Sequence, residues 1–251
     1  MEKPACATVF VPLRIGPSHK SEQGSQLLFG EKYSIIDKSH NWIKVRNEFD
    51  GYEGWIDNDH HHYFMTDDDT RSVVLSHRAV FQDEKGNSLY LEPGSELYNY
   101  NEDGSSFTAG GRKYVSGSKI KLCPPEESLT ETSMRFLNAP YLWGGRTSSG
   151  MDCSGFTQIV YKIHGHSLPR DSFRQAEIGN TISFLGEARA GDLLFFDNDK
   201  GEISHVGILL NEDSIIHGSG VVRIDRIDHQ GIFNPDSNKY THRLRVIKRV
   251  I

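Results

Sequence analysis

Cysteine is scarce in this chain of 251 residues, and Cys6, Cys123 and Cys153 are the only three. Three is a small and odd number that does not fit a disulfide framework, although a single Cys6–Cys123 bridge stays open. No two of them stand in a CxxC arrangement, so a cysteine-based zinc site is not indicated. The odd count is compatible with a reducing compartment.

Long apolar runs and an excess of basic residues are also missing. No run approaches the length of a transmembrane helix, and no signal-peptide core follows Met1–Pro4. We therefore expect no membrane partner and a cytoplasmic location, or a periplasmic or exported one if a leader has been removed. The net charge of −6 and the lack of a basic stripe argue against nucleic acid as a partner.

No metal or cofactor is expected either. The run His60-His61-His62 has no acidic or cysteine partner at ligand spacing, so a solvated loop is favoured over a metal site. What the chain does have is an ordinary globular composition and a length that allows two or three domains.

Residues 1–125 are predicted to be all-β, because short alternating or apolar runs are separated there by Gly, Pro, Asn and Asp. We expect a small barrel over residues 1–66 and a second β domain over 67–125. The acidic run Asp67-Asp68-Asp69 is the expected linker, and Cys123-Pro124-Pro125 is the expected boundary. Strands are expected at Ala7–Leu13, Lys32–Asp37, Trp42–Arg46, Tyr52–Ile56, Ser72–Leu75, Val80–Gln82, Leu89–Leu91, Glu96–Tyr98 and Arg112–Val115.

Residues 126–251 are predicted to form an α+β domain, with helices first and an antiparallel sheet after them. Ser128 and Glu131 form a capping-box pattern ahead of an apolar run that ends before Pro140. Further helices are expected after Asp152 and around Gln175. Strands are expected at Asp192–Phe196, Ser204–Leu210, Ser214–His217, Val221–Ile224 and Thr241–Val250.

The stretch Asp152-Cys153-Ser154-Gly155-Phe156 is the strongest candidate for chemistry. Asp152 is a good N-cap, and apolar residues recur at helical spacing from Phe156 to a stop at Gly165. Cys153 then lies in the first turn, where the helix dipole lowers the pKa of a thiol and favours the nucleophilic thiolate. A small buried core residue is the alternative for a lone cysteine.

Two histidines are candidates for a base. His205 and His217 stand on two predicted strands joined at Asn211–Asp213, and their positions have the same parity, so both rings lie on one face of the hairpin. They are directly opposite if Asn211 is the centre of the turn, and diagonal if the register shifts by one pair. One ring acts as the base while the other orients it.

The C-terminal motifs resemble those of the NlpC family of bacterial cell-wall peptidases, a papain-like group, over roughly residues 130–250. The motifs are Pro140–Gly145, Asp152–Phe156, Leu168-Pro169-Arg170, Gly191–Phe196, Ser204–Ile208 and Ile216-His217. The resemblance implies a papain-like fold, with Cys153 as nucleophile, His205 as base and His217 as orienting residue. It also implies that peptide bonds of the murein stem are cleaved without a metal or cofactor.

The N-terminal strands resemble bacterial SH3 domains, on the strength of Trp42–Arg46 followed by Gly51–Ile56. The whole chain is similar to γ-D-glutamyl-L-diamino acid endopeptidases that carry two such barrels in front. This resemblance implies cleavage of L-Ala-γ-D-Glu-diaminopimelate, or its lysine counterpart, in the recycling of wall peptides. It implies that the free amine of L-Ala is bound by Tyr52, Glu22, Asp152, Ser154 and Ser172, with Glu31 as the second choice of acid.

Two other classes of function stay open. One is a wall-binding module whose papain-like domain is inactive, although both Cys153 and His205 are present. The other is a papain-like amidase or acyltransferase acting on a different amide. Within the peptidase reading, a hydrolase that remodels intact peptidoglycan is a further alternative.

Overall fold

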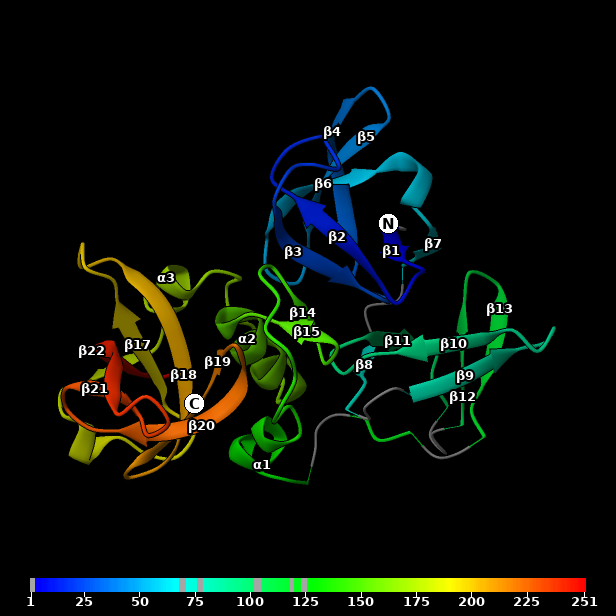
Figure 1. The fold of residues 1–251 in the computed structure, drawn as a ribbon. Coiled ribbons are helices and arrows are strands. Elements are labelled where there is room, and N and C mark those ends of the chain that lie inside the picture. Colours follow the sequence, from blue (N-terminus) through cyan, green and yellow to red (C-terminus); the bar gives the residue numbers. More distant parts are fainter. Residues whose placement is uncertain (1–2, 68–70, 76–78, 102–104, 118–119, 123–125) are drawn as a thin grey trace. The chain divides into compact units, whose positions relative to one another are not determined.

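The computed structural model describes residues 3–67, 71–75, 79–101, 105–117, 120–122 and 126–251 (Figure 1). The chain divides into two compact units. Unit 1 comprises residues 1–126, 143–148 and 162–167, and unit 2 comprises residues 127–142, 149–161 and 168–251. Asp68, Asp69 and Cys123–Pro125 lie outside the described residues, and so does the Cys6–Cys123 bridge.

The first part of unit 1 is a five-stranded antiparallel sheet in the order β3-β2-β6-β5-β4. Its alternating strands place one set of apolar side chains, including Val45 and Ile56, in a buried cluster. The predicted run Ala7–Leu13 begins as a loop and enters a strand only at Phe10. The strands are β2 Phe10–Arg14, β3 Gln23–Leu28, β4 Tyr33–Ser39, β5 Trp42–Asn47 and β6 Glu53–Asp57, with the pair β1 Lys3–Cys6 and β7 Tyr63–Thr66, and the 3-10 helix η1 Asn58–His60.

The second part of unit 1 has a four-stranded sheet in the order β10-β9-β13-β12 and a separate pair, β8 with β11. One hydrophobic cluster joins Phe29 and Phe64 of the first part to Phe81 and Phe107 of the second. The second part as an SH3-like barrel, and the domain boundaries, stay predictions. The strands are β8 Arg71–Val73, β9 Ala79–Asp83, β10 Ser88–Leu91, β11 Glu96–Tyr98, β12 Ser106–Ala109 and β13 Arg112–Val115.

A close backbone approach explains one glycine between these two parts of unit 1. Gly30 has a φ of +81°, and a Cβ built on it would lie 1.9 Å from the carbonyl oxygen of Glu96. The amide of Glu96 in turn donates to the carbonyl of Phe29. A larger residue at position 30 would therefore separate the two parts.

Unit 2 contains short helices and a seven-stranded antiparallel sheet in the order β16-β22-β17-β18-β19-β20-β21. β22 also pairs with β21, so the sheet curls and closes on itself (Figure 1). The expected α+β character is confirmed, although sheet outweighs helix. The elements are α1 Leu129–Met134, β15 Gly150–Met151, α2 Cys153–Ile163, α3 Ser172–Gln175, β16 Asn180–Ile182, η2 Leu185–Glu187, β17 Leu193–Asp197, β18 Ile203–Asn211, β19 Ser214–Ser219, β20 Val221–Ile227, β21 Gly231–Asn234 and β22 Lys239–Arg249, with β14 Arg146–Thr147 in unit 1.

Capping sets the first helix of unit 2, as the sequence predicts. The backbone N–H of Glu131 donates to the Ser128 hydroxyl, and the Glu131 carboxylate accepts the Ser128 N–H at 2.7 Å. These bonds satisfy amides that the helix start would leave unpaired. α1 and α3 both pack against β18.

The β18–β19 hairpin has a bulge that sets its register. Gly207 pairs with His217 and Leu209 with Ile215, whereas Asn211 pairs with Ser214, so the pairing slips by one residue between Leu209 and Asn211. His205 stands two residues before Gly207 on β18 and is therefore diagonal to His217. Of the two registers open at the sequence level, the diagonal one is correct, and both rings still share one face.

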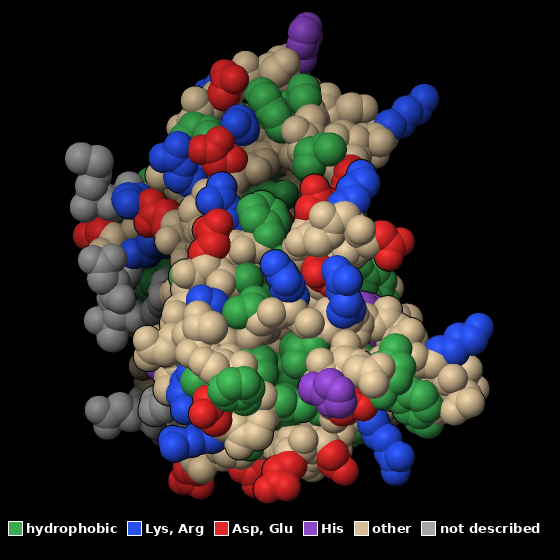
Figure 2. Space-filling model, turned by 90° about the vertical axis from the view of Figure 1, so that its left-hand side faces the viewer, with side chains coloured by type: hydrophobic (Ala, Val, Ile, Leu, Met, Phe, Trp, Pro, Cys, Tyr) green, Lys and Arg blue, Asp and Glu red, His purple; other side chains and the backbone are tan. Residues whose placement is uncertain are grey.

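Surface charge is mixed on the face that Figure 2 shows. Lys and Arg side chains are interspersed there with Asp and Glu, and no continuous basic surface is visible on that face. Among the helices within the described ranges, none is long and apolar enough to cross a membrane.

Candidate active site

The start of α2 positions the candidate nucleophile. The Asp152 carboxylate accepts the backbone N–H of Gly155 at 2.7 Å, and α2 begins at Cys153. Phe156, Ile159 and Val160 are fully buried, as their spacing predicts. Cys153 is thus held in the first turn of α2.

The prediction that the pKa of the Cys153 thiol is lowered is wrong. Cys153 is only 7% exposed. Burial and the negative charge of Asp152 raise the pKa of its thiol to about 12, and hydrogen bonding and Arg170 offset this only in part. Desolvation of a charged sulfur therefore disfavours the thiolate, and the thiol needs a base beside it.

The histidine hairpin supplies a hydrogen-bonded line of groups. His205 Nε2 lies 2.9 Å from His217 Nδ1, and His217 Nε2 lies 3.1 Å from Asp225 Oδ2. All three side chains are buried and come from neighbouring strands, β18, β19 and β20. The pair of histidines that the sequence predicts on one face is brought into direct contact.

His205 and His242 are held in the neutral form. Burial, with smaller contributions from His217 and His242, lowers the pKa of His205 well below its ordinary value. His242 on β22 stacks on His205 with ring centroids 4.1 Å apart, and burial lowers the pKa of His242 to about 4. A neutral imidazole has one nitrogen with a lone pair, which can accept a proton.

Cys153 lies against the residues that follow the two histidines. The backbone N–H of Val206 donates to the Cys153 sulfur. A Cβ built on Gly218 would lie 3.3 Å from the backbone nitrogen of Cys153, so this glycine gives the peptide room. Burial, Cys153 and Asp152 also raise the pKa of Tyr141 to about 12. Unit 2 therefore gathers a thiol, a hydrogen-bonded imidazole pair and a backbone donor in one place.

The predicted amine ligands of unit 2 are already engaged. Asp152 forms a two-pronged ion pair with Arg170, with contacts of 3.0 and 2.5 Å. The Ser154 hydroxyl lies 2.9 Å from Arg170 Nη1 and 3.2 Å from Asp152 Oδ1. Ser172 is the first residue of α3 and is buried. Because Arg170 neutralises Asp152, this group alone carries no net negative charge.

The predicted amine ligands of unit 1 differ among themselves. The exposed carboxylate of Glu22 accepts the indole N–H of Trp143. Tyr52 packs on the barrel core. A Cβ built on Gly24 would lie only 2.0 Å from the Tyr52 hydroxyl oxygen, so this glycine leaves room for the hydroxyl. Glu31, the second choice of acid, is fully buried and already paired with Arg146 and Lys162.

Asp225, His242 and Arg170 were not predicted to belong to the site. A signal for Asp225 does exist, because His217 pairs with Arg223 and Asp225 is the next residue on the same face of β20. Arg170 belongs to the Leu168-Pro169-Arg170 motif, but the motif does not indicate that Asp152 is its partner. His242 reaches His205 only through the closure of the sheet, which no local pattern shows.

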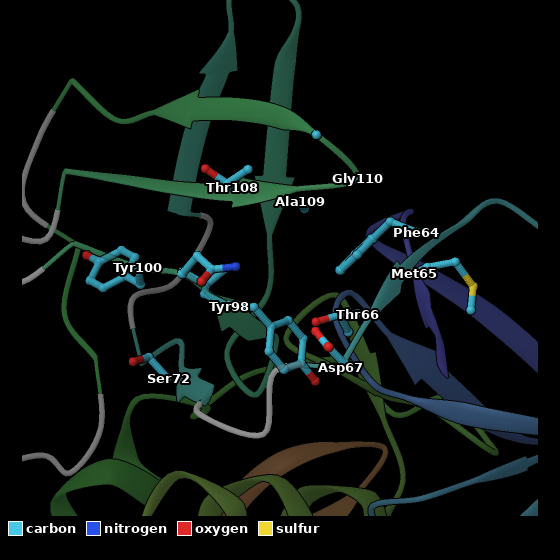
Figure 3. Close-up of a pocket in the computed structure, with 13 residues that line it drawn as sticks. Phe64, Met65, Thr66, Asp67, Ser72, Tyr98, Tyr100, Thr108, Ala109 and Gly110 are labelled. Atoms are coloured by element: carbon cyan, nitrogen blue, oxygen red, sulfur yellow. The ribbon is translucent and has the colours of Figure 1, made fainter. Parts of the chain in front are cut away.

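A separate hollow of about 770 Å³ lies in unit 1 (Figure 3). Phe64, Tyr98, Tyr100 and Asp67 line it together with the turn at Gly110. Its lining contains neither cysteine nor histidine. Across the described part of the chain, no cluster of three His, Cys, Asp or Glu side chains has the geometry of a metal site.

Comparison with known protein families gives two matches. Residues 138–242 match the NlpC/P60 family, and residues 13–60 match the bacterial dipeptidyl-peptidase SH3 domain. The first range contains the candidate nucleophile and both histidines, and the second contains Tyr52 and Glu22.

Individual relatives cover most of the chain. A protein of Bacillus cereus named gamma-D-glutamyl-L-lysine dipeptidyl-peptidase is 31% identical over 77% of this chain and 66% of its own length. A Bacillus subtilis protein of the same name is 30% identical over 77% of this chain and 71% of its own. The chain thus spans about two thirds of the length of these relatives.

A solved structure shows the same fold. The crystal structure of an NlpC/P60 family protein from Bacillus cereus aligns over 99% of both chains with a TM-score of 0.83 and 22% identity. Fold and site together define a papain-like cysteine peptidase preceded by a bacterial SH3 domain. The chain belongs to the NlpC/P60 family.

Proposed function

We propose that the protein is a cysteine endopeptidase that cleaves the γ-D-glutamyl–diamino acid bond of murein stem peptides with a free N-terminal L-Ala, in the recycling of wall peptides. The observation that carries the proposal is the hydrogen-bonded pair His205–His217 beside the helix-start thiol Cys153. The names of the two Bacillus relatives support the choice of bond.

The proposed reaction uses the neutral groups of the site. His205 takes the proton of the Cys153 thiol as the sulfur attacks the γ-carbonyl carbon of D-Glu. The backbone N–H of Cys153 stabilises the oxyanion, with Tyr141 as a candidate for the second donor. His205 returns the proton to the leaving amine, and water then hydrolyses the thioester to release L-Ala-D-Glu. Because the Cys153 pKa is high, proton transfer and attack are expected to be concerted.

The proposed amine ligands are Asp152, Ser154, Ser172, Tyr52 and Glu22. An ammonium group removed from water needs acceptors and a negative charge. Since Arg170 neutralises Asp152 at 2.5 Å, we assign the compensating charge to Glu22. A peptide joined to sugar through that nitrogen has no ammonium, which favours recycling over hydrolysis of intact wall.

The test compares kcat/KM on free and N-acetylated L-Ala-γ-D-Glu-diaminopimelate. Acetylation removes a charge-assisted contact of roughly 1.5–3 kcal/mol, and we expect at least a ~100-fold loss once steric exclusion is added. Glu22→Gln should reduce this discrimination, and Tyr52→Phe should reduce it less. Glu53→Gln, on the same barrel, is the matched control.

Two outcomes would contradict the proposal. Equal rates on the two peptides, or efficient digestion of intact sacculi, would favour a wall-remodelling hydrolase. Release of a different product, identified by mass spectrometry, would favour an amidase or acyltransferase. The same assay with L-lysine in place of diaminopimelate determines which diamino acid is preferred.

A further inference from the structure

Asp225 is a buried carboxylate that the reaction above does not use. It stands on β20 with a side chain only 1% exposed. One oxygen lies 3.1 Å from His217 Nε2, and the other accepts from Arg223 Nη2 at 2.8 Å. Burial of a carboxylate is costly unless each oxygen has a donor, and here both do.

The protonation of Asp225 determines where the histidine protons are. Burial alone would raise its pKa, but the hydrogen bonds from His217 and Arg223 hold the pKa of Asp225 below its ordinary value. An ionised carboxylate only accepts hydrogen bonds, so His217 must carry its proton on Nε2. A neutral His217 then has a lone pair on Nδ1.

The tautomer of His205 follows from that of His217. The Nδ1 lone pair of His217 lies 2.9 Å from His205 Nε2, so that nitrogen must donate. A neutral His205 that carries its proton on Nε2 has its lone pair on Nδ1. That nitrogen is the one left to take a proton from a thiol.

We propose that Asp225 is a positioning residue that sets the tautomers of both histidines and thereby makes His205 Nδ1 the base. The proposal rests on the roles proposed for Cys153, His205 and His217. It adds a fourth member, which touches no substrate and acts through two imidazole rings. When His205 takes the proton, Asp225 also provides the negative charge at the other end of the line.

Among the described residues, the charged side chains recorded at this end of the line are Asp225 and, bound to it, Arg223. His205 on β18 and His242 on β22 face it as rings, the latter with centroids 5.7 Å apart. The backbone of Cys153 on α2 lies close to Gly218, the residue after His217. Arg223 Nη2, which binds Asp225, also lies 2.9 Å from a carboxylate oxygen of the exposed Asp236.

Substitutions at position 225 give an order of activities that a purely structural role does not predict. An Asn side chain there has one oxygen and one NH₂ group, and Arg223 requires the oxygen. The NH₂ group then faces His217 Nε2 and forces the opposite tautomer on both rings. We expect Asp225→Asn to lower kcat roughly 1000-fold with little change in KM, since a wrong tautomer in a comparable triad costs about 10⁴. Asp225→Ala, which leaves the tautomer free, should lose only roughly 10- to 100-fold.

A second substitution tests the cause. Adding Arg223→Ala to Asp225→Asn removes the demand for the oxygen, so the amide can turn and accept from His217. We expect this double variant to recover at least about tenfold in kcat. Asp236→Asn is the matched control, because it changes the other carboxylate on Arg223 without contacting His217, and its kcat should stay within twofold.

A readout independent of turnover separates this proposal from the proposed function. Nitrogen-15 NMR of histidine-labelled protein should show His217 protonated on Nε2 in the wild type and on Nδ1 in Asp225→Asn. Loss of fold is checked by the thermal midpoint of both. If Asp225→Asn is as active as wild type, or the NMR tautomer does not change, the tautomer role is overturned. If the wild type shows the tautomer but cleaves no murein peptide, only the proposed function fails.

Discussion

Two buried polar clusters in this protein use opposite electrostatics. In unit 1, Glu31 contacts Arg146 at 2.8 Å and Lys162 at 2.6 Å, while Lys162 also lies 2.9 Å from Glu96. Each of these side chains is at most 2% exposed. In unit 2, the rings of His205 and His217 form a hydrogen-bonded line that ends at one carboxylate, Asp225.

The difference concerns where protons can go. Although burial would raise it, Arg146 and Lys162 lower the pKa of Glu31 to about 2, so the Glu31 carboxylate stays ionised. Around His205 burial favours the neutral form, so a proton can arrive and leave during a reaction. The first arrangement suits a rigid scaffold, and the second suits acid–base chemistry.

Removing the Cys153 thiol should give the largest effect, because the neighbouring side chains His205, His217 and Asp225 cannot replace it as the nucleophile. We expect Cys153→Ala to lower kcat by about 10⁵-fold or more while the thermal midpoint stays nearly unchanged. Cys6, the buried thiol of unit 1, is the control through Cys6→Ala. Residual turnover of more than a thousandth of wild type would exclude Cys153 as the nucleophile.

The two histidines should differ in the next-largest effect. His205→Ala removes the base and should cost roughly 10⁴-fold in kcat, whereas His217→Ala removes only its orientation and should cost roughly 10²-fold. Steady-state kinetics on the same peptide gives both numbers. The reverse ranking would exchange the two roles.

Breaking the charged cluster should affect folding rather than chemistry. Glu31→Gln leaves Arg146 and Lys162 buried without full compensation, and we expect a loss of about 3–5 kcal/mol in the free energy of unfolding. Urea titration measures it, with Glu53→Gln, which breaks the partly exposed pairs with Lys44 and Arg46, as a control that should change stability much less. A stable Glu31→Gln protein would show that the cluster is dispensable.

Acid should separate the two clusters further. The stabilisation from Glu31 is fully present above the unfolded carboxyl pKa of about 4.3 and is lost as pH falls through about 2. A titration of unfolding midpoint against pH should therefore show this contribution decreasing only below about pH 4.3. Glu31→Gln should lack that part of the acid dependence.

The smallest expected effect concerns His242, whose pKa is lowered to about 4 mainly by burial. Between pH 4 and the unfolded value of about 6.5 the unfolded chain binds more protons, so stability should rise with pH in this window. We expect a contribution of at most roughly 2 kcal/mol after allowance for partial exposure. His242→Phe keeps the stacked ring and should flatten this rise. An unchanged slope would assign it to other groups.

Local patterns in the sequence are sufficient for the elements that carry the site. The cap at Asp152, the apolar spacing from Phe156 and the shared parity of His205 and His217 all predict what the structure contains. β3 was missed because Ser25 and Gln26 are polar yet buried, which hides the alternation.

Features that depend on packing at a distance were not predictable. The pKa of the Cys153 thiol depends on its burial by residues that are distant in the sequence. Burial raises this pKa, whereas the position at the helix start predicts a lowered one. The contact of His242 with His205 depends on closure of the sheet. Asp152 precedes α2 in the sequence and Arg170 follows it, and their spacing alone does not indicate that they form an ion pair.

The bulge in the β18–β19 hairpin constrains how this part of the chain can change length. Side chains alternate between faces, so a single insertion or deletion in the turn at Asn211–Asp213 would shift the pairing of Gly207 with His217 by one residue. The ring of His217 would then leave the face that carries His205. Active descendants of this sequence should therefore gain or lose turn residues two at a time, or balance a single change by removing the bulge itself.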